Sequence, residues 1–304
     1  MSIAAFLTGF VLALSGVFPP QDVETIPSVG PTGPMRQVAT DFLFTEGPAA
    51  DTQGNVYFTD VRGNTIYRID RDGNVSPFLE NSEGCNGLMI TRDGRLIACQ
   101  GGGKRIIAIH PDSKEIDVIA DSFEGQPFDR PNDLVLDRQG GIYFTDPGIG
   151  AVYYIDAERS VHRILTDLPR PNGILLSPDG RTLYVLPSGT PDVLSYVLAA
   201  PGKPGEAVVL CQLEQAPGTD ARGGDGLTVD DRGVLYLTQP SLGAIQVVAP
   251  NGNTLGFIKV PENPSNCAFA GPDFNTLYIT ARTSVYAVPM EAKGFILAIA
   301  DDPE

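Results

Sequence analysis

The stretch RPNDLVLDRQGGIYFTD, residues 130–146, contains one complete unit of the pattern that sets the fold of this chain. A polar residue, Asn132, is followed by three apolar residues, 134–136, then by a polar turn that ends at Gly140, and then by a second strand-like run, 142–146. A short apolar run bounded by turn residues is typical of a strand that is buried on both faces. Glycine provides the positive φ that a tight hairpin needs. The unit therefore predicts two antiparallel strands that begin at a polar side chain.

The same unit occurs six times along the chain, and an acid or an amide opens each copy: Glu46-Gly-Pro, Asn86-Gly-Leu, Asn132-Asp-Leu, Asn172-Gly-Ile, Asp225-Gly-Leu and Asn266-Cys-Ala. Eight residues later a glycine follows in every copy except the last, where Phe274 stands. Two further strand-like runs complete most copies, so that a four-stranded meander returns about every 40–50 residues. This pattern predicts an all-β fold, a six-bladed β-propeller with four antiparallel strands in each blade.

The sixth copy lacks an outer strand of its own. The segment RQVATDF, residues 36–42, stands directly before Glu46, in the place where an outer strand precedes each later signature. We therefore expect this N-terminal strand to pair with the last blade and close the ring, which removes exposed sheet edges. The segment from Gly294, GFILAI, is an alternative or additional partner for that edge. The predicted propeller domain spans residues 36–304.

The N-terminus contains the one long apolar run, residues 3–18, which is short for a membrane-spanning helix. Small residues at Ala13 and Ser15 fit a signal-peptidase site, although no Lys or Arg precedes the run. We predict a signal peptide over residues 1–18, a linker over 19–35, export to the periplasm or the extracellular space, and no stable membrane insertion after processing. If the run is not a signal, the protein stays in the cytoplasm with a peripheral N-terminus.

The chain is acidic, with a net charge of −16 and a pI near 4.4. This disfavours nucleic acids and anionic membranes as partners, since both are polyanions. The sequence carries no prediction of oligomeric state. Its four cysteines form no CxxC pair, so a thiolate zinc site is disfavoured and buried free thiols are expected.

The inner strands of a propeller follow its central channel, so the six signature side chains should converge at one mouth of that channel. Glu46 and Asp225 would bring two negative charges, and Asn132 and Asn172 would bring neutral oxygens. Such an all-oxygen ring suits Ca²⁺ best, with Zn²⁺, Mg²⁺ or Mn²⁺ as alternatives. Asn-Gly and Asp-Gly are also ordinary turn dipeptides. That alternative does not explain Glu46, because glutamate is not a turn former. Asn86 and Asn266 could instead hydrogen-bond to backbone across the channel.

The chain resembles the SMP-30/gluconolactonase/luciferin-regenerating-enzyme family, and within it the bacterial gluconolactonases most. The likeness extends from about Thr45 to Pro289 and depends on short motifs: Phe44-Thr-Glu46-Gly-Pro, Asn86-Gly-Leu, Arg130-Pro-Asn132-Asp, Tyr143-Phe-Thr-Asp-Pro147, Pro171-Asn172-Gly, Gly224-Asp225-Gly and Pro264-Ser-Asn266. The resemblance implies one catalytic divalent cation at the channel mouth, with Glu46, Asn172 and Asp225 as ligands. It further implies that Asn132 is another ligand or a substrate contact and that Arg130 reaches substrate hydroxyls.

These residues favour a metal-dependent lactonase in which Asp225 takes the proton from the attacking water. A promiscuous phosphotriesterase or ester hydrolase with the same site is an alternative, and so is a non-catalytic propeller scaffold with a structural calcium. Arg130, Asn86 and Asn132 could hydrogen-bond to a substrate. Since the chain has no Trp to form an aromatic wall, we expect a small polyhydroxylated lactone rather than a long acyl-chain lactone.

Two segments differ from the gluconolactonase pattern, 99–104 and 148–150. Both should lie where a substrate lid would be. If the enzyme instead prefers an acyl chain, the residues expected to contact that chain are Ile149 and Phe128.

Overall fold

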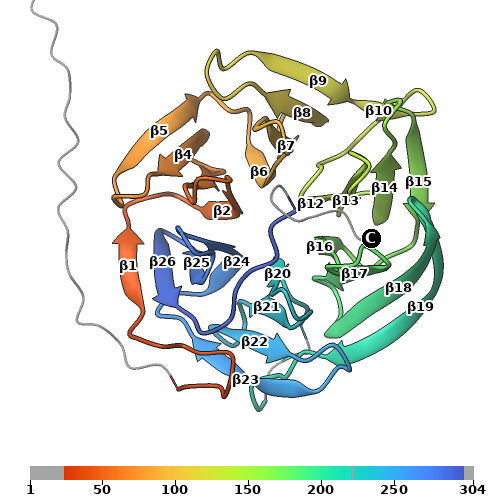
Figure 1. The fold of residues 1–304 in the computed structure, drawn as a ribbon. Helices are drawn as coiled ribbons and strands as arrows, with labels where there is room; N and C mark the ends of the chain where they lie inside the picture. Colours follow the sequence, from red (N-terminus) through yellow and green to blue (C-terminus); the bar gives the residue numbers. More distant parts are fainter. Residues whose placement is uncertain (1–23, 219, 221, 298–304) are drawn as a thin grey trace, which may run out of the picture.

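In the computed structural model, which describes residues 24–218, 220 and 222–297, six four-stranded antiparallel sheets form a ring (Figure 1). In chain order the first three blades are blade 1, β2(Thr45–Ala50), β3(Val56–Asp60), β4(Thr65–Ile69) and β5(Val75–Glu80); blade 2, β6(Cys85–Ile90), β7(Leu96–Gln100), β8(Arg105–Ile109) and β9(Ile116–Ala120); and blade 3, β12(Leu134–Leu136), β13(Ile142–Asp146), β14(Ala151–Ile155) and β15(Val161–Leu165).

The second half of the ring repeats this order. Its blades are blade 4, β16(Pro171–Leu176), β17(Thr182–Pro187), β18(Asp192–Ala200) and β19(Lys203–Gln212); blade 5, β20(Leu227–Val229), β21(Leu235–Gln239), β22(Ala244–Val248) and β23(Thr254–Lys259); and blade 6, β24(Pro264–Ala270), β25(Thr276–Ala281), β26(Ser284–Pro289) and β1(Arg36–Ala39). A small hairpin, β10(Ser122–Phe123) and β11(Gln126–Pro127), lies between blades 2 and 3 and was not predicted. The six-bladed, all-β fold is thus confirmed.

The ring closes through the N-terminal strand, as predicted. Strand β1 pairs antiparallel with β26, with Arg36 opposite Ala287 and Gln37 opposite Tyr286. The segment from Gly294 does not supply this edge. Instead Gly294 pairs with Asp230, and the N–H of Phe295 donates to the carbonyl of Val229 at 3.0 Å. Phe295, Ile296 and Leu297 then line the end of the channel opposite the signatures.

Blade packing is apolar because the second strand of most blades is buried along its whole length, for example in β3, β7, β13 and β21. Threonines on these strands also link neighbouring blades. The hydroxyl of Thr59 donates to the carbonyl of Asn86 at 3.1 Å, and that of Thr145 donates to the carbonyl of Asn172 at 2.7 Å. Each of these bonds fixes a signature residue from the blade before it.

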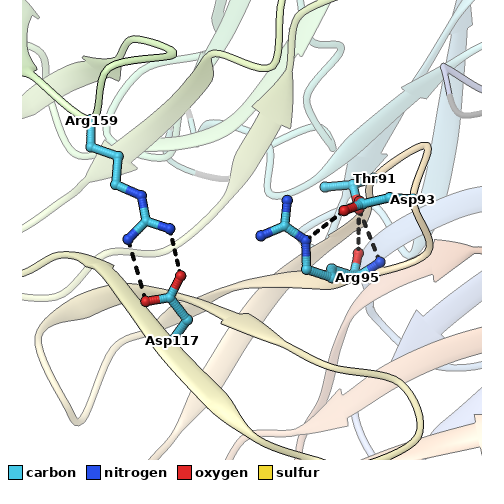
Figure 2. Close-up of polar contacts among 5 residues, drawn as sticks. All are labelled: Thr91, Asp93, Arg95, Asp117 and Arg159. Carbon is cyan, nitrogen blue, oxygen red and sulfur yellow. Dashed lines mark hydrogen bonds and ion pairs between the residues drawn. The ribbon is translucent and has the colours of Figure 1, made fainter.

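Each meander runs down, up, down and up, so the loops alternate between the channel mouth and the far face. On the far face, the guanidinium of Arg159 in blade 3 pairs with the carboxylate of Asp117 in blade 2, at 2.5 and 3.3 Å (Figure 2). Both side chains are half exposed, and pairs of this kind contribute little to stability. The blades are therefore held together mainly by their apolar faces and by the threonine bonds.

The remaining sequence predictions have mixed outcomes. The four cysteines are free thiols, and three of them are buried, as expected. The predicted signal peptide lies outside the described residues. Within the part of the chain that the structure describes, there is no helix long and apolar enough to cross a membrane.

Candidate active site

The loops that lead into the signatures of blades 1 and 3 are fixed by buried aspartates at the ends of the second strands. The carboxylate of Asp60 accepts the backbone N–H groups of Leu43 at 3.0 Å, Phe44 at 2.9 Å and Gly63 at 2.9 Å. The carboxylate of Asp146 accepts those of Asp129 at 2.8 Å and Arg130 at 3.1 Å. Asp60 thereby sets the approach to Glu46, and Asp146 sets the approach to Asn132.

The glycine after most signatures is required by close contact between blades, rather than by a turn. A Cβ on Gly226 would lie 2.0 Å from the Cγ of Asn266, and a Cβ on Gly87 would lie 2.4 Å from the Oδ1 of Asp133. Neither Gly87 nor Gly226 has a positive φ. The signature residues thus pack against one another around the ring, which is how a sequence repeat becomes a compact site.

Asn172 and Asp225 are brought into direct contact from blades 4 and 5. The amide nitrogen of Asn172 donates to the Oδ1 of Asp225 at 2.6 Å. Both side chains are partly exposed at the mouth. One carboxylate oxygen of Asp225 is therefore hydrogen-bonded to the amide of Asn172. The two residues meet because they stand at the start of the inner strands of adjacent blades.

Glu46 lies beside this pair and is buried, with 4% of its surface exposed. One carboxylate oxygen accepts the N–H of Gly47 at 3.0 Å. Burial and the negative charges of Asp225 and Asp133 raise the pKa of Glu46 well above its usual value, while hydrogen bonds from Gly47 and Asn266 lower it. The predicted ligands Glu46, Asn172 and Asp225 are thus gathered at one place.

Asp133 is a third acid at this site, and the sequence interpretation missed it. Its carboxylate accepts the N–H of Leu134 at 3.0 Å and lies 3.4 Å from the amide nitrogen of Asn266. Burial raises its pKa to about 7, against the lowering effect of these hydrogen bonds. A sequence signal was present, because Asp133 occupies the position after the signature, where four other blades have glycine.

Burial also raises the pKa of Asp225 to about 7, and the charge of Asp133 raises this pKa further. The hydrogen bond from Asn172 and the charge of Arg282 act in the opposite direction and lower the pKa of Asp225. Glu46, Asp133 and Asp225 therefore repel one another in a poorly solvated site. A divalent cation would remove that repulsion, and carboxylate plus amide oxygens are the donors that Ca²⁺ accepts. No group of three or more His, Cys, Asp and Glu side chains in the described residues is arranged to hold a metal. The predicted set consists of two carboxylates and one amide, and these are donor types that Ca²⁺ accepts.

The other predicted site residues belong to the same mouth. Asn86 and Asn132 are partly exposed on adjacent blades, joined by a backbone bond from Gly87 to the carbonyl of Asn132 at 2.8 Å. Arg130 is exposed at the entrance to blade 3. Asn266 is buried, and its side-chain oxygen accepts the N–H of Cys267, the next residue, at 2.8 Å. Across the channel its amide nitrogen meets a side chain, the carboxylate of Asp133, rather than backbone.

One expectation about the lid is wrong. Phe128 is 1% exposed and packs edge-on against Phe144, with ring centroids 5.0 Å apart, so it is a core residue. It cannot contact a substrate without unpacking blade 3. Ile149, in contrast, is 41% exposed in the loop after β13.

The fold and the site together define a six-bladed propeller with carboxylates and amides gathered at one channel mouth. The sequence profile of the SMP-30/Gluconolactonase/LRE-like region matches residues 44–283. The chain belongs to this family. Its similarity is therefore not limited to the motifs but covers all six signatures.

Individual relatives agree with this assignment. A gluconolactonase from Zymomonas mobilis is 30% identical, over 86% of this chain and 82% of the relative. Among solved structures, the gluconolactonase XC5397 from Xanthomonas campestris has a TM-score of 0.78 at 23% identity, covering 90% of this chain and 99% of that one. A calcium-binding regucalcin from Agrobacterium tumefaciens has a TM-score of 0.74 at 21% identity, covering 85% and 94%. The two structures support the fold.

Proposed function

We propose that this protein hydrolyses the ester bond of small sugar lactones and that it uses one divalent cation, bound by Glu46, Asn172 and Asp225. The observation that carries the proposal is the contact of Asn172 with Asp225 beside the buried Glu46, in a family with gluconolactonase relatives. Ca²⁺ is the preferred ion because the donors are all oxygen. Asn132 is a further ligand or a substrate contact.

A bound divalent cation would polarise the lactone carbonyl and lower the pKa of a coordinated water. The chain's own residues supply the rest of the chemistry. Asp225 accepts the proton of the attacking water through the oxygen that Asn172 does not hold. In metal-free protein burial raises the pKa of Asp225 to about 7. A bound cation would lower this pKa and keep the carboxylate ionised at neutral pH, as a general base must be.

Arg130, Asn86 and Asn132 bind the hydroxyl groups of the sugar. They stand on blades 2 and 3, whereas Glu46 stands on blade 1 and Asp225 on blade 5. The substrate would therefore lie across the mouth with its ester bond towards the acidic side. Polar groups of this kind are left unpaired by a long acyl chain, which is costly.

The test is hydrolysis of D-glucono-1,5-lactone above its uncatalysed rate, followed by proton release, with protein stripped of metal and then reloaded with Ca²⁺, Mg²⁺, Mn²⁺ or Zn²⁺. We expect activity only after reloading. A long-chain acyl homoserine lactone and a phosphotriester serve as comparison substrates. Full activity after exhaustive chelation would overturn the metal assignment, and hydrolysis of the phosphotriester alone would overturn the substrate assignment.

A further inference from the structure

Arginine side chains surround the channel mouth. They stand in loops of five blades and are all exposed: Arg62, Arg130, Arg170, Arg222 and Arg282. Among the residues that the structure describes, none of these guanidinium groups forms an ion pair. Arg62 lies over the ring of Phe44, at 5.3 Å from its centroid. An acidic protein thus presents unpaired positive charge at the entrance to its candidate site.

Arg282 is the arginine most closely tied to the predicted metal ligands. It occupies the turn between β25 and β26, and its carbonyl accepts the N–H of Thr45 at 2.8 Å. Thr45 directly precedes Glu46. Arg282 thus lies next to the start of the strand that carries Glu46, β2(Thr45–Ala50).

The turn that carries Arg282 is held in place by Glu262. The carboxylate of Glu262 accepts the N–H of Thr283 at 2.9 Å, the hydroxyl of Thr283 at 3.0 Å and the phenol of Tyr286 at 2.9 Å, together with the hydroxyl of Ser284. The carboxylate of Glu262 is therefore hydrogen-bonded by neutral donors of the turn and of β26. The guanidinium of Arg282 therefore remains available to a ligand on a turn that is already ordered.

Arg130 stands on the opposite side of the mouth. It precedes blade 3, while Arg282 belongs to blade 6, and these two blades face each other across the ring (Figure 1). The backbone of Arg130 is fixed by Asp146, as described above, and a Cβ on Gly101 would lie 3.2 Å from the Cγ of Arg130. Two exposed arginines on well-anchored backbone thus flank the same opening.

The placement of Arg282 needs an explanation if the site also binds a divalent cation. A second positive charge close to a cation is repelled unless an anion lies between them or beside them. Carboxylates, sulfonates and phosphates match the planar fork of a guanidinium and form its strongest hydrogen bonds. Apart from its ester group, a neutral sugar lactone offers hydroxyl groups and no anion, and amide side chains can also bind hydroxyl groups.

We propose that Arg282, together with Arg130, is a specificity residue that selects lactones carrying an anionic substituent, such as the carboxylate of a sugar diacid or a phosphate on the sugar. This inference rests on the lactonase function proposed above and narrows its substrate class. The anionic group would lie against one of the two arginines, since they stand on opposite sides of the mouth. The arginines would also attract such substrates to the mouth, an effect that salt weakens.

The experiment compares kcat and KM for three lactones on the calcium-loaded protein: neutral D-glucono-1,5-lactone, the carboxylate D-glucaro-1,4-lactone and 6-phospho-D-glucono-1,5-lactone. We expect wild-type protein to prefer a charged lactone, with a KM that rises with ionic strength. The carboxylate and phosphate substrates distinguish the two sources of negative charge. In Arg282→Gln the ratio of kcat/KM for the charged lactone to that for the neutral one should fall about 10- to 100-fold, the size of a hydrogen bond to a charged group.

Arg71→Gln is the matched control, because it removes one exposed arginine from a turn on the far face. In Arg71→Gln the ratio of kcat/KM for the charged lactone to that for the neutral one should equal that of wild type. Arg282→Lys keeps the charge without the fork, and its ratio should lie between those of Arg282→Gln and wild type. It serves in place of Arg282→Gln if the latter fails to fold.

A wild-type preference for the neutral lactone would overturn the proposal. So would an equal loss on both substrates in Arg282→Gln, which would assign Arg282 to the ester chemistry instead. In both of those cases hydrolysis of the neutral lactone would leave the proposed function intact. If the wild-type protein hydrolyses no lactone with any metal, the proposed function itself is wrong.

Discussion

The amide nitrogen of Asn266 lies 3.4 Å from a carboxylate oxygen of Asp133, although the two residues belong to blades on opposite sides of the ring. The channel is therefore narrow enough at this level for side chains to meet across its axis. Asn266 also hydrogen-bonds to Glu46. The amide of Asn266 therefore links Asp133, which no sequence motif identified, to Glu46, a predicted metal ligand.

Asp133 should strengthen cation binding through its charge. We predict that Asp133→Asn weakens Ca²⁺ binding at least about 10-fold, because a carboxylate a few ångströms from a divalent cation attracts it by several kcal/mol at an effective dielectric constant near 20, and desolvation of the carboxylate offsets only part of this attraction. The measurement is isothermal titration calorimetry. Asp72→Asn, which removes an exposed acid from a far-face turn, is the control for net charge. An unchanged dissociation constant in Asp133→Asn would assign this acid a structural role only.

The stability of metal-free protein should depend on pH in a defined direction. The folded carboxyls of Asp133 and Asp225 have pKa values near 7, against an ordinary value of 3.8, so the folded state holds protons that the unfolded chain releases. Their contribution is complete below pH 4 and is lost as pH rises towards 7, by up to about 1.4 kcal/mol per pH unit for each group. We expect the Tm of chelated protein to fall between pH 5 and pH 7.5.

Calcium should reverse this trend, because the ion binds the deprotonated carboxylates of the folded state. The increase in Tm on adding Ca²⁺ should therefore be larger at pH 7.5 than at pH 5, as measured by differential scanning calorimetry. Asp133→Asn removes one of the groups, and its metal-free Tm should fall less over the same range. A Tm of chelated wild-type protein that rises with pH would contradict the assignment of the two groups.

Asp225 combines two roles that one substitution separates. Asp225→Asn keeps an oxygen ligand but removes the base and one charge, so we expect kcat to fall by about 10²- to 10⁴-fold, the usual contribution of a general base. Metal content, measured after loading at high Ca²⁺, should remain near one ion. Asn132→Ala is the companion variant, and it should affect KM more than metal content. A wild-type kcat in metal-loaded Asp225→Asn would show that a residue other than Asp225 is the general base.

Asp146 and Asp60 should affect the site at a distance, as positioning residues. Asp146→Asn leaves one of two backbone N–H groups unpaired, at a cost of about 1–3 kcal/mol in stability. Since those groups belong to Asp129 and Arg130, we expect KM to rise while Ca²⁺ affinity changes little. Asp60→Asn, by contrast, disturbs the approach to Glu46 and should weaken Ca²⁺ binding. Equal effects of the two variants on both quantities would indicate general destabilisation.

Much of the fold could be predicted from the sequence, because each blade is a local meander whose strands and turns follow one another along the chain. The period of the signatures, the apolar runs and the turn glycines predicted six blades, and the place of residues 36–42 before Glu46 predicted the closing strand. The hairpin of β10 and β11 escaped prediction since two-residue strands leave no periodic signal. The N-terminal export signal remains a prediction.

The sequence alone determined which oxygen-bearing residues open each blade, because a fixed register places equivalent positions at equivalent heights. Only the tertiary structure decided what surrounds them. Asp133, Asn266 and Arg282 contribute to the site through contacts and charges between blades that are far apart in the chain. The burial that raises the pKa of the three acids likewise depends on how closely the blades approach the axis. That distance is set by packing of whole sheets, and no local pattern of residues encodes it.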